Sequence, residues 1–185
     1  SGETSVGRYP LETVETMARI IESTEQHGLE RIPPLGSRPR TRGGAITRAA
    51  VEIADQLDAR YICAFTQSGD TARRLGRLRP VRPLIAFTSL EATLNVLALS
   101  WGIRPVLVDF AGHTDKMTAQ VDQYLFDAGL VDLDDLVVIA AGSPPGTTGS
   151  TNMLKVHRVG DLADAGSGNL RRREKVGPWP ADAQP

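Results

Sequence analysis

Short apolar runs alternate with segments of helical spacing through most of this chain, and this alternation constrains its fold more than any other feature. Five runs have strand character, at residues 61–65, 83–87, 104–110, 135–141 and 151–159. Helical spacing precedes and separates them, at residues 45–57, 71–78, 88–99 and 115–129. The first four runs are almost continuously apolar, as in strands covered on both faces. The sequence therefore predicts βαβ units and a mostly parallel sheet, that is, an α/β fold.

Proline, glycine and arginine divide the chain into parts. Residues 9–26 have the spacing of an amphipathic helix. Residues 31–44 are rich in all three residue types and are interpreted as a linker, so residues 1–30 are expected to belong to a different unit from residues 45–160. After that the apolar pattern ends, and residues 161–185 are expected to form a mobile tail.

Composition favours a globular protein of the cytoplasm. The chain is 41% hydrophobic and 23% charged with a formal net charge of −1, which gives no sign of a nucleic-acid or membrane partner. A single cysteine, Cys63, excludes an internal disulfide, and no apolar run approaches the roughly 20 residues of a membrane span. The chain starts without Met or a signal-peptide pattern, and we expect it to be part of something longer.

The segment 66–74, TQSGDTARR, follows the first predicted strand and opens the next predicted helix. Hydroxyl side chains and Gly69 lie where unpaired helical N–H groups would face outward, an arrangement that suits an anion. The P-loop and dinucleotide patterns are absent. Asp70 either caps those N–H groups itself or points aside toward a hydroxyl or a cation. From spacing alone, an anion site and a plain capped turn are equal alternatives.

A second polar loop, residues 140–152, follows the fourth predicted strand and is rich in Gly, Pro, Ser and Thr. Its length favours a functional loop over a plain connector. The two loops would lie side by side only if the first and fourth strands are neighbours.

No catalytic or metal-binding pattern accompanies these loops. The three histidines, His27, His113 and His157, are scattered and lack the spacing of a metal site. Cys63 lies in an apolar strand and is interpreted as a buried small hydrophobe. Thr88 and Glu91 have the spacing of a capping box for the helix at 88–99.

Several separate motifs, in consistent order, resemble the C-terminal part of pyruvate kinase, and their residues are similar to those of actinobacterial members. They are SGETSVGRYPLETVETMARI, AVEIADQL, TQSGDTARRL, WGIRPVLV and DLVVIAAGSPPGTTGSTNMLKV, and the likeness runs from residue 1 to about residue 159. The resemblance implies that residues 1–30 come from the end of a catalytic (β/α)8 barrel and that residues 45–160 form the regulatory domain. It also implies a three-layer sandwich whose five-stranded sheet has the order 3-2-1-4-5, with the last strand antiparallel.

Members of this family transfer a phosphoryl group from phosphoenolpyruvate to ADP, and phosphorylated allosteric effectors bind between the two loops. Carried over to this sequence, the effector phosphate would be held by Thr66, Gln67, Ser68, Gly69 and Thr71, with Gly146, Thr148, Gly149 and Ser150 on the facing loop. Asp70 stands where members activated by fructose 1,6-bisphosphate commonly have basic or hydroxyl residues. The resemblance therefore implies AMP or a sugar monophosphate in preference to that bisphosphate.

The family's catalytic Lys, Mg²⁺ carboxylates and K⁺ site belong to the barrel upstream of residue 1. This chain alone is therefore expected to hold no cofactor and to be inactive, although the parent is an enzyme. The last strand, residues 152–159, is where family tetramers pair, which implies a homo-oligomer. The alternative is a ligand-free module that only assembles subunits, with its loop capped by Asp70.

Overall fold

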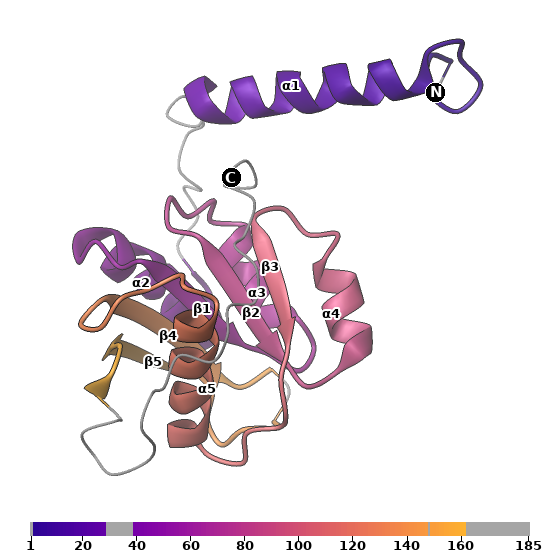
Figure 1. The fold of residues 1–185 in the computed structure, drawn as a ribbon. Coiled ribbons are helices and arrows are strands. Elements are labelled where there is room, and N and C mark those ends of the chain that lie inside the picture. The colour runs from indigo at the N-terminus through magenta and orange to yellow at the C-terminus, as the bar shows by residue number, and fades with distance from the viewer. Residues whose placement is uncertain (1, 29–38, 148, 162–185) are drawn as a thin grey trace. The chain divides into compact units, whose positions relative to one another are not determined.

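The computed structural model describes residues 2–28, 39–147 and 149–161. Contacts divide the chain into two compact units, with the division between residues 37 and 38. Figure 1 shows the helices and strands of each unit.

The first unit consists mainly of helix α1, Pro10–Gly28, close to the predicted bounds. Proline suits the first helical position because its missing N–H would be unpaired there. No residue of this helix is buried, and apolar side chains such as Leu11, Val14 and Ile21 are more than half exposed. That this helix derives from a barrel stays a prediction.

The second unit is built on one five-stranded sheet (Figure 1). Its strands are β1 Tyr61–Phe65, β2 Leu84–Thr88, β3 Ile103–Leu107, β4 Leu136–Gly142 and β5 Thr151–Arg158. They have the order β3-β2-β1-β4-β5, in which β5 is antiparallel to β4 and all other neighbours are parallel. The predicted fold class and strand order are confirmed.

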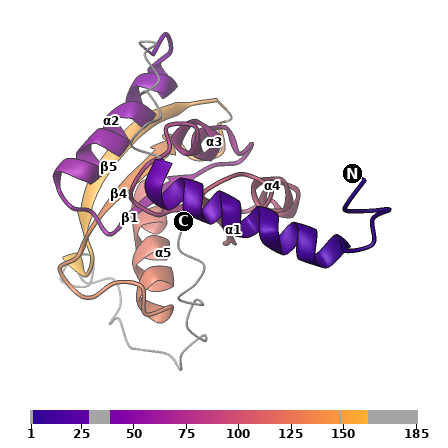
Figure 2. The same ribbon diagram turned by 90° about the horizontal axis from the view of Figure 1, so that it is seen from above.

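Helices cover both faces of the sheet (Figure 2). They are α2 Arg42–Gln56, α3 Asp70–Gly76, α4 Glu91–Leu97 and α5 Thr114–Asp127. Core residues of α2, α3 and α4 cluster with one face of the strands, and those of α5 cluster with the other face. The domain is therefore the expected three-layer sandwich.

Side chains of β1 show how the two cores form. Ile62 and Ala64 join the cluster under α2, α3 and α4, whereas Cys63 and Phe65 join the cluster under α5. Successive side chains of a strand point to opposite faces, so a continuously apolar run feeds both cores. Phe65 stacks on Phe87 of β2 with ring centroids 5.0 Å apart. The apolar runs recognised in the sequence are thus the two-faced centre of the domain.

Two details of the helix starts differ from expectation. Helix α2 begins at Arg42, three residues early, because the Thr41 side chain accepts a hydrogen bond from Gly44 N–H at 3.1 Å and caps it. The expected capping box at Thr88 and Glu91 is wrong. Thr88 is the last residue of β2, and its hydroxyl accepts from Leu90 N–H at 3.2 Å instead, so helix α4 starts without a side-chain cap.

Candidate functional site

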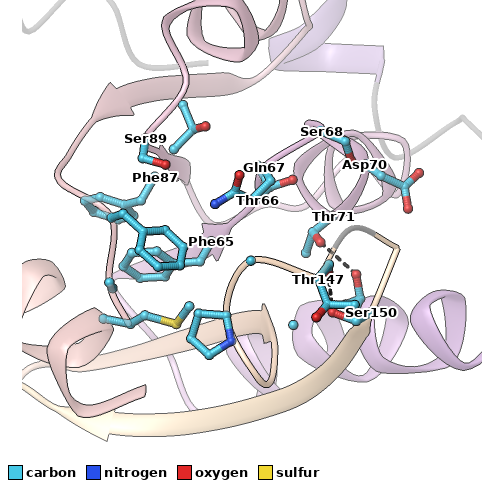
Figure 3. Close-up of a pocket in the computed structure, with 18 of the residues that line it drawn as sticks. Phe65, Thr66, Gln67, Ser68, Asp70, Thr71, Phe87, Ser89, Thr147 and Ser150 are labelled. Atoms are coloured by element: carbon cyan, nitrogen blue, oxygen red, sulfur yellow. Dashed lines mark hydrogen bonds between the residues drawn. The ribbon is translucent and has the colours of Figure 1, made fainter. Parts of the chain in front are cut away.

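A pocket opens where the parallel strands end (Figure 3). The last residues of β1, β2 and β4 line it, together with the loops that follow these strands and β3. Its volume, which includes space open to solvent, is about 560 Å³. It lies at the point where strand order reverses, since β1 has β2 on one side and β4 on the other. Ligands of open α/β sheets bind at such a point.

The first loop, residues 66–69, is held by its backbone. Thr66 N–H donates to the Phe87 carbonyl at 3.0 Å, and the Gln67 carbonyl accepts from the Thr93 hydroxyl at 2.5 Å. Gly69 caps α3 in the left-handed region, with φ of 80°, where residues other than glycine are strained. The Ser68 hydroxyl is exposed and has no hydrogen-bond partner among the described residues. The loop is therefore preformed, with a hydroxyl available for a ligand.

Asp70 does not cap its helix. Its carboxylate accepts a hydrogen bond from Arg74 Nε at 2.7 Å, one turn further along α3, and Arg74 also donates to the Thr41 hydroxyl at 3.3 Å. Figure 3 shows Asp70 on the far side of the loop from Phe65. Of the alternatives left open by the sequence, the one in which Asp70 turns to a cationic partner is confirmed, and the capping role is wrong.

In the facing loop between β4 and β5, the side-chain amide of Asn152 makes two hydrogen bonds with the backbone of Ser143. Asn152 Oδ1 accepts from Ser143 N–H at 2.7 Å, while Asn152 Nδ2 donates to the Ser143 carbonyl at 2.6 Å. Within the loop the Ser150 hydroxyl donates to the Thr147 carbonyl at 2.6 Å. Gly146 has a φ of 90°, which favours glycine at that turn. These bonds fold the loop over the pocket as a short hairpin connection.

One hydrogen bond joins the two sides of the pocket. Thr71 Oγ1 of α3 lies 2.7 Å from Thr151 Oγ1, the first residue of β5, and both side chains are buried. One hydroxyl donates and the other accepts, so the acceptor keeps its own proton for a further bond. The contact links residues 80 positions apart and fixes the distance between the loops.

Most of the predicted site residues are brought together. The pocket is lined by Thr66, Gln67, Ser68, Thr71, Gly146, Gly149 and Ser150. Gly69 shapes the loop without appearing in the lining, and Thr148 lies outside the described residues. Their role in binding a ligand stays a prediction.

Sequence reasoning missed the walls formed by the other two parallel strands. Phe87 and Ser89 come from the end of β2, and Asp109 and Phe110 come from the loop after β3. The signal was present, because the carboxyl ends of all parallel strands lie at one edge of a sheet. Phe110 also reaches the facing loop: a methyl group on Gly146 would lie 3.3 Å from its ring.

Hydroxyl, amide and carboxylate groups make up the polar part of the pocket. Within the described part of the chain, no Lys, Arg or His lines it. Asp70 is offset by Arg74, whereas Asp109 has no ion pair or hydrogen bond to its carboxylate among the described residues. Such a lining offers hydrogen bonds to one anionic group but little charge to neutralise several.

A second buried polar pair, His157 and Asp122, lies apart from this pocket. His157 Nε2 of β5 is 2.7 Å from Asp122 Oδ1 of α5, and both side chains are almost fully buried. Burial raises the pKa of the nearby Cys63 thiol, and the Asp122 carboxylate raises it further.

The described residues contain no group of three or more His, Cys, Asp or Glu placed to hold a metal, and no helix among them could cross a membrane. The expectation that Cys63 is buried is confirmed.

A pocket at the switch in strand order of a sheet covered on both faces defines an α/β domain of the kind that binds small ligands at its carboxyl edge. Residues 44–157 match the family described as pyruvate kinase, alpha/beta domain, and the chain belongs to that family.

Its relatives agree with this assignment. A pyruvate kinase from Mycobacterium tuberculosis is 50% identical over 161 residues, which cover 87% of this chain and 34% of the relative. One from Corynebacterium glutamicum is 47% identical over the same coverage. The crystal structure of a pyruvate kinase from Cryptosporidium parvum superposes with a TM-score of 0.70 over 86% of this chain and 32% of that one, at 23% identity, and supports the fold. The chain thus spans about a third of the length of the relatives it matches.

Proposed function

We propose that this domain is the regulatory part of a pyruvate kinase and that its pocket binds a phosphorylated effector. The observation that carries the proposal is the meeting of two hydroxyl-rich loops at the carboxyl edge of β1 and β4. Thr66, Ser68, Thr71 and Ser150 place four hydroxyl groups around one opening. Hydroxyl and backbone N–H groups are the donors that hold a phosphate where no lysine or arginine is present.

The effector is proposed to carry one phosphate, as AMP or a sugar monophosphate does. Two carboxylates and no cation line the described part of the pocket. A second phosphate would add charge that these groups cannot neutralise, and like charges at close range repel. Fructose 1,6-bisphosphate is therefore the poorer candidate.

A second proposed role is assembly of subunits through β5. This strand stands at the edge of the sheet, pairs with β4 on one side and leaves its other edge unpaired within the described residues. Val156 of this strand is 40% exposed. An open edge is a template for pairing with another strand, here that of a second copy.

The two roles are compatible because they share one hairpin. The facing loop leads directly into Thr151, which is the first residue of β5 and bonds Thr71. A ligand that moves the loop would then act on the strand that pairs subunits. Allostery of this kind requires a different ligand affinity in the two states of assembly.

The activity itself, phosphoryl transfer from phosphoenolpyruvate to ADP, is proposed for the whole protein, as are its Mg²⁺ and K⁺ and its place in cytoplasmic glycolysis. The 185-residue chain alone is expected to bind effector without turning over substrate. A coupled assay for pyruvate formation on the purified chain tests this, and measurable turnover would refute it.

A thermal-shift titration tests the binding proposal directly. A ligand that binds only the folded state stabilises it by about 2.7 kcal/mol at a hundredfold excess over its dissociation constant. AMP, glucose 6-phosphate and ribose 5-phosphate should include at least one such ligand. Ser68→Ala should reduce the shift, because it removes an exposed hydroxyl of the pocket that has no partner in the described structure.

The matched control is Ser100→Ala, which removes a hydroxyl outside the pocket in the turn after α4. It should leave the ligand-induced shift unchanged. If no phosphorylated compound shifts the parent chain, effector binding is wrong and assembly remains as the function. Sedimentation of the chain without ligand then tests whether the subunits pair on their own.

A further inference from the structure

The loop after β3 forms a third wall of the pocket and is fixed in place by backbone contacts. Val108 N–H donates to the carbonyl of the last β2 residue at 2.9 Å, extending the ladder beyond β3. The Asp109 carbonyl accepts from Gln120 Nε2 at 2.8 Å, and the Phe110 carbonyl accepts from Lys116 Nζ at 3.2 Å. The position of Asp109 in the lining is therefore set by both β2 and α5.

Asp109 brings a negative charge that nothing in the described lining offsets. Asp70, the other carboxylate of the pocket, is bridged to Arg74 at 2.7 Å. The carboxylate of Asp109 has no hydrogen bond or ion pair within the described part of the chain. Lys116 donates to the Phe110 carbonyl of this loop but does not line the pocket. The two carboxylates thus differ in what they present to a ligand.

We propose that Asp109 sets the ligand class of this pocket: one phosphate at the hydroxyl loops, and neutral hydroxyl or amino donors at Asp109. The inference rests on the proposed function and deepens it. An ionised carboxylate only accepts hydrogen bonds, so it pairs with the hydroxyl or amino groups of a ligand and repels a second phosphate. Sugar monophosphates and nucleoside monophosphates offer hydroxyl or amino donors at the end away from the phosphate, where a bisphosphate carries its second phosphate.

Asp70 is the weaker determinant for a physical reason. Its charge is largely cancelled by an arginine on the same helix, and it lies on the far side of the loop in Figure 3. A substitution at Asp70 also releases Arg74, so it would alter the helix as well as the pocket. Asp109 can be changed without removing a partner that any described residue needs, because only its backbone carbonyl is bonded.

The test is calorimetric titration of the 185-residue chain with ribose 5-phosphate, AMP, fructose 1,6-bisphosphate and inorganic phosphate. Asp109→Asn keeps the shape and removes the charge. It should raise affinity for the bisphosphate relative to the better monophosphate by at least about tenfold, the order expected for removing a like charge at short range. Asp115→Asn changes an exposed carboxylate of α5 that does not line the pocket and should leave this ratio within about twofold.

The outcomes distinguish the role of Asp109 from effector binding itself. If the parent chain binds a monophosphate but Asp109→Asn leaves the ratio unchanged, the role of Asp109 is wrong and effector binding stands. If inorganic phosphate binds as tightly as the larger compounds, the pocket recognises the phosphate alone and Asp109 has no role. If the parent chain binds none of the four probes, both proposals are wrong. Melting curves of each variant confirm that the chain is folded in every titration.

Discussion

The hydrogen bond between Thr71 and Thr151 predicts that substitutions at these two positions are coupled in their effect on the free energy of unfolding. Both hydroxyls are buried, at 5% and 4% exposed, and lie 2.7 Å apart. Thr71→Val keeps the side-chain volume but leaves the Thr151 hydroxyl buried without this partner. An unsatisfied buried hydroxyl costs about 1–3 kcal/mol, and we expect either single substitution to lower the free energy of unfolding by that amount.

Replacing both threonines should cost much less than the sum of the two single substitutions. Two valines of the same shape leave no unpaired hydroxyl, and such paired replacements are close to neutral. Because each single change should cost about 1–3 kcal/mol and the double change almost nothing, the expected coupling energy is at least about 2 kcal/mol. In a chain of this size each kcal/mol corresponds to roughly 2–4 °C in melting temperature, so urea denaturation and calorimetry can both resolve it.

The control cycle uses Thr118→Val on α5, a buried threonine that shares no hydrogen-bond partner with Thr71. Its cost should add to that of Thr71→Val within about 0.5 kcal/mol. Additive costs in the Thr71 and Thr151 cycle as well would refute the reasoning, because the two hydroxyls would then be satisfied independently. The two loops would not be tied together as the structure indicates.

Three further predictions concern single positions. Gly69→Ala should destabilise the domain by about 1–2 kcal/mol in urea denaturation, because Gly69 has a φ of 80° and an added methyl group would lie 3.2 Å from Leu97. As a control, Gly112→Ala places its methyl group in open space and should leave stability unchanged. His157→Ala should lower the free energy of unfolding by about 1–3 kcal/mol, because the buried Asp122 carboxylate loses its bond to His157 and keeps only the one from Gly160 N–H at 3.4 Å. The double change of both residues to Leu should cost less. Cys63 should resist iodoacetamide until urea unfolds the chain, because burial raises the pKa of its thiol. The contribution of the Cys63 thiol to the free energy of unfolding should be complete below pH 9.0, the ordinary pKa of a thiol. It should decline as pH rises above that value, because only the thiol of the unfolded chain ionises there. Equilibrium denaturation from pH 8 to 10, compared with that of Cys63→Ala, measures this decline.

The sheet could be predicted from the sequence because its strands carry their own signal. Residues 61–65 and 136–141 are apolar throughout, as expected for short strands covered on both faces. Strand order was a different matter. Nothing in the spacing distinguishes β4 beside β1 from β4 beside β3, and the order came from the likeness to a family.

The local errors have a common origin in competition for hydrogen bonds. Thr88 has the right spacing from Glu91 for a capping box, but it is the last residue of β2 and its hydroxyl accepts from Leu90 N–H instead. Asp70 has the right position to cap α3, but Arg74 one turn later offers an opposite charge at 2.7 Å. In both cases a short polar side chain had two acceptable partners, and tertiary context chose between them.

Part of the site could be predicted because the directions of β4 and β5 bring the two polar loops to the same edge of the sheet. Because β4 is parallel to β1, it ends at the same edge of the sheet, and because β5 turns back from there, its first residue also lies at that edge. The loop between them must therefore hang over the end of β1, where the residues of the first loop begin. Thr151 is then both a lining residue of the pocket and the first residue of the edge strand β5. A protein that uses the pocket for a ligand and the edge for a second copy needs no further connecting element between the two, since one hairpin carries both.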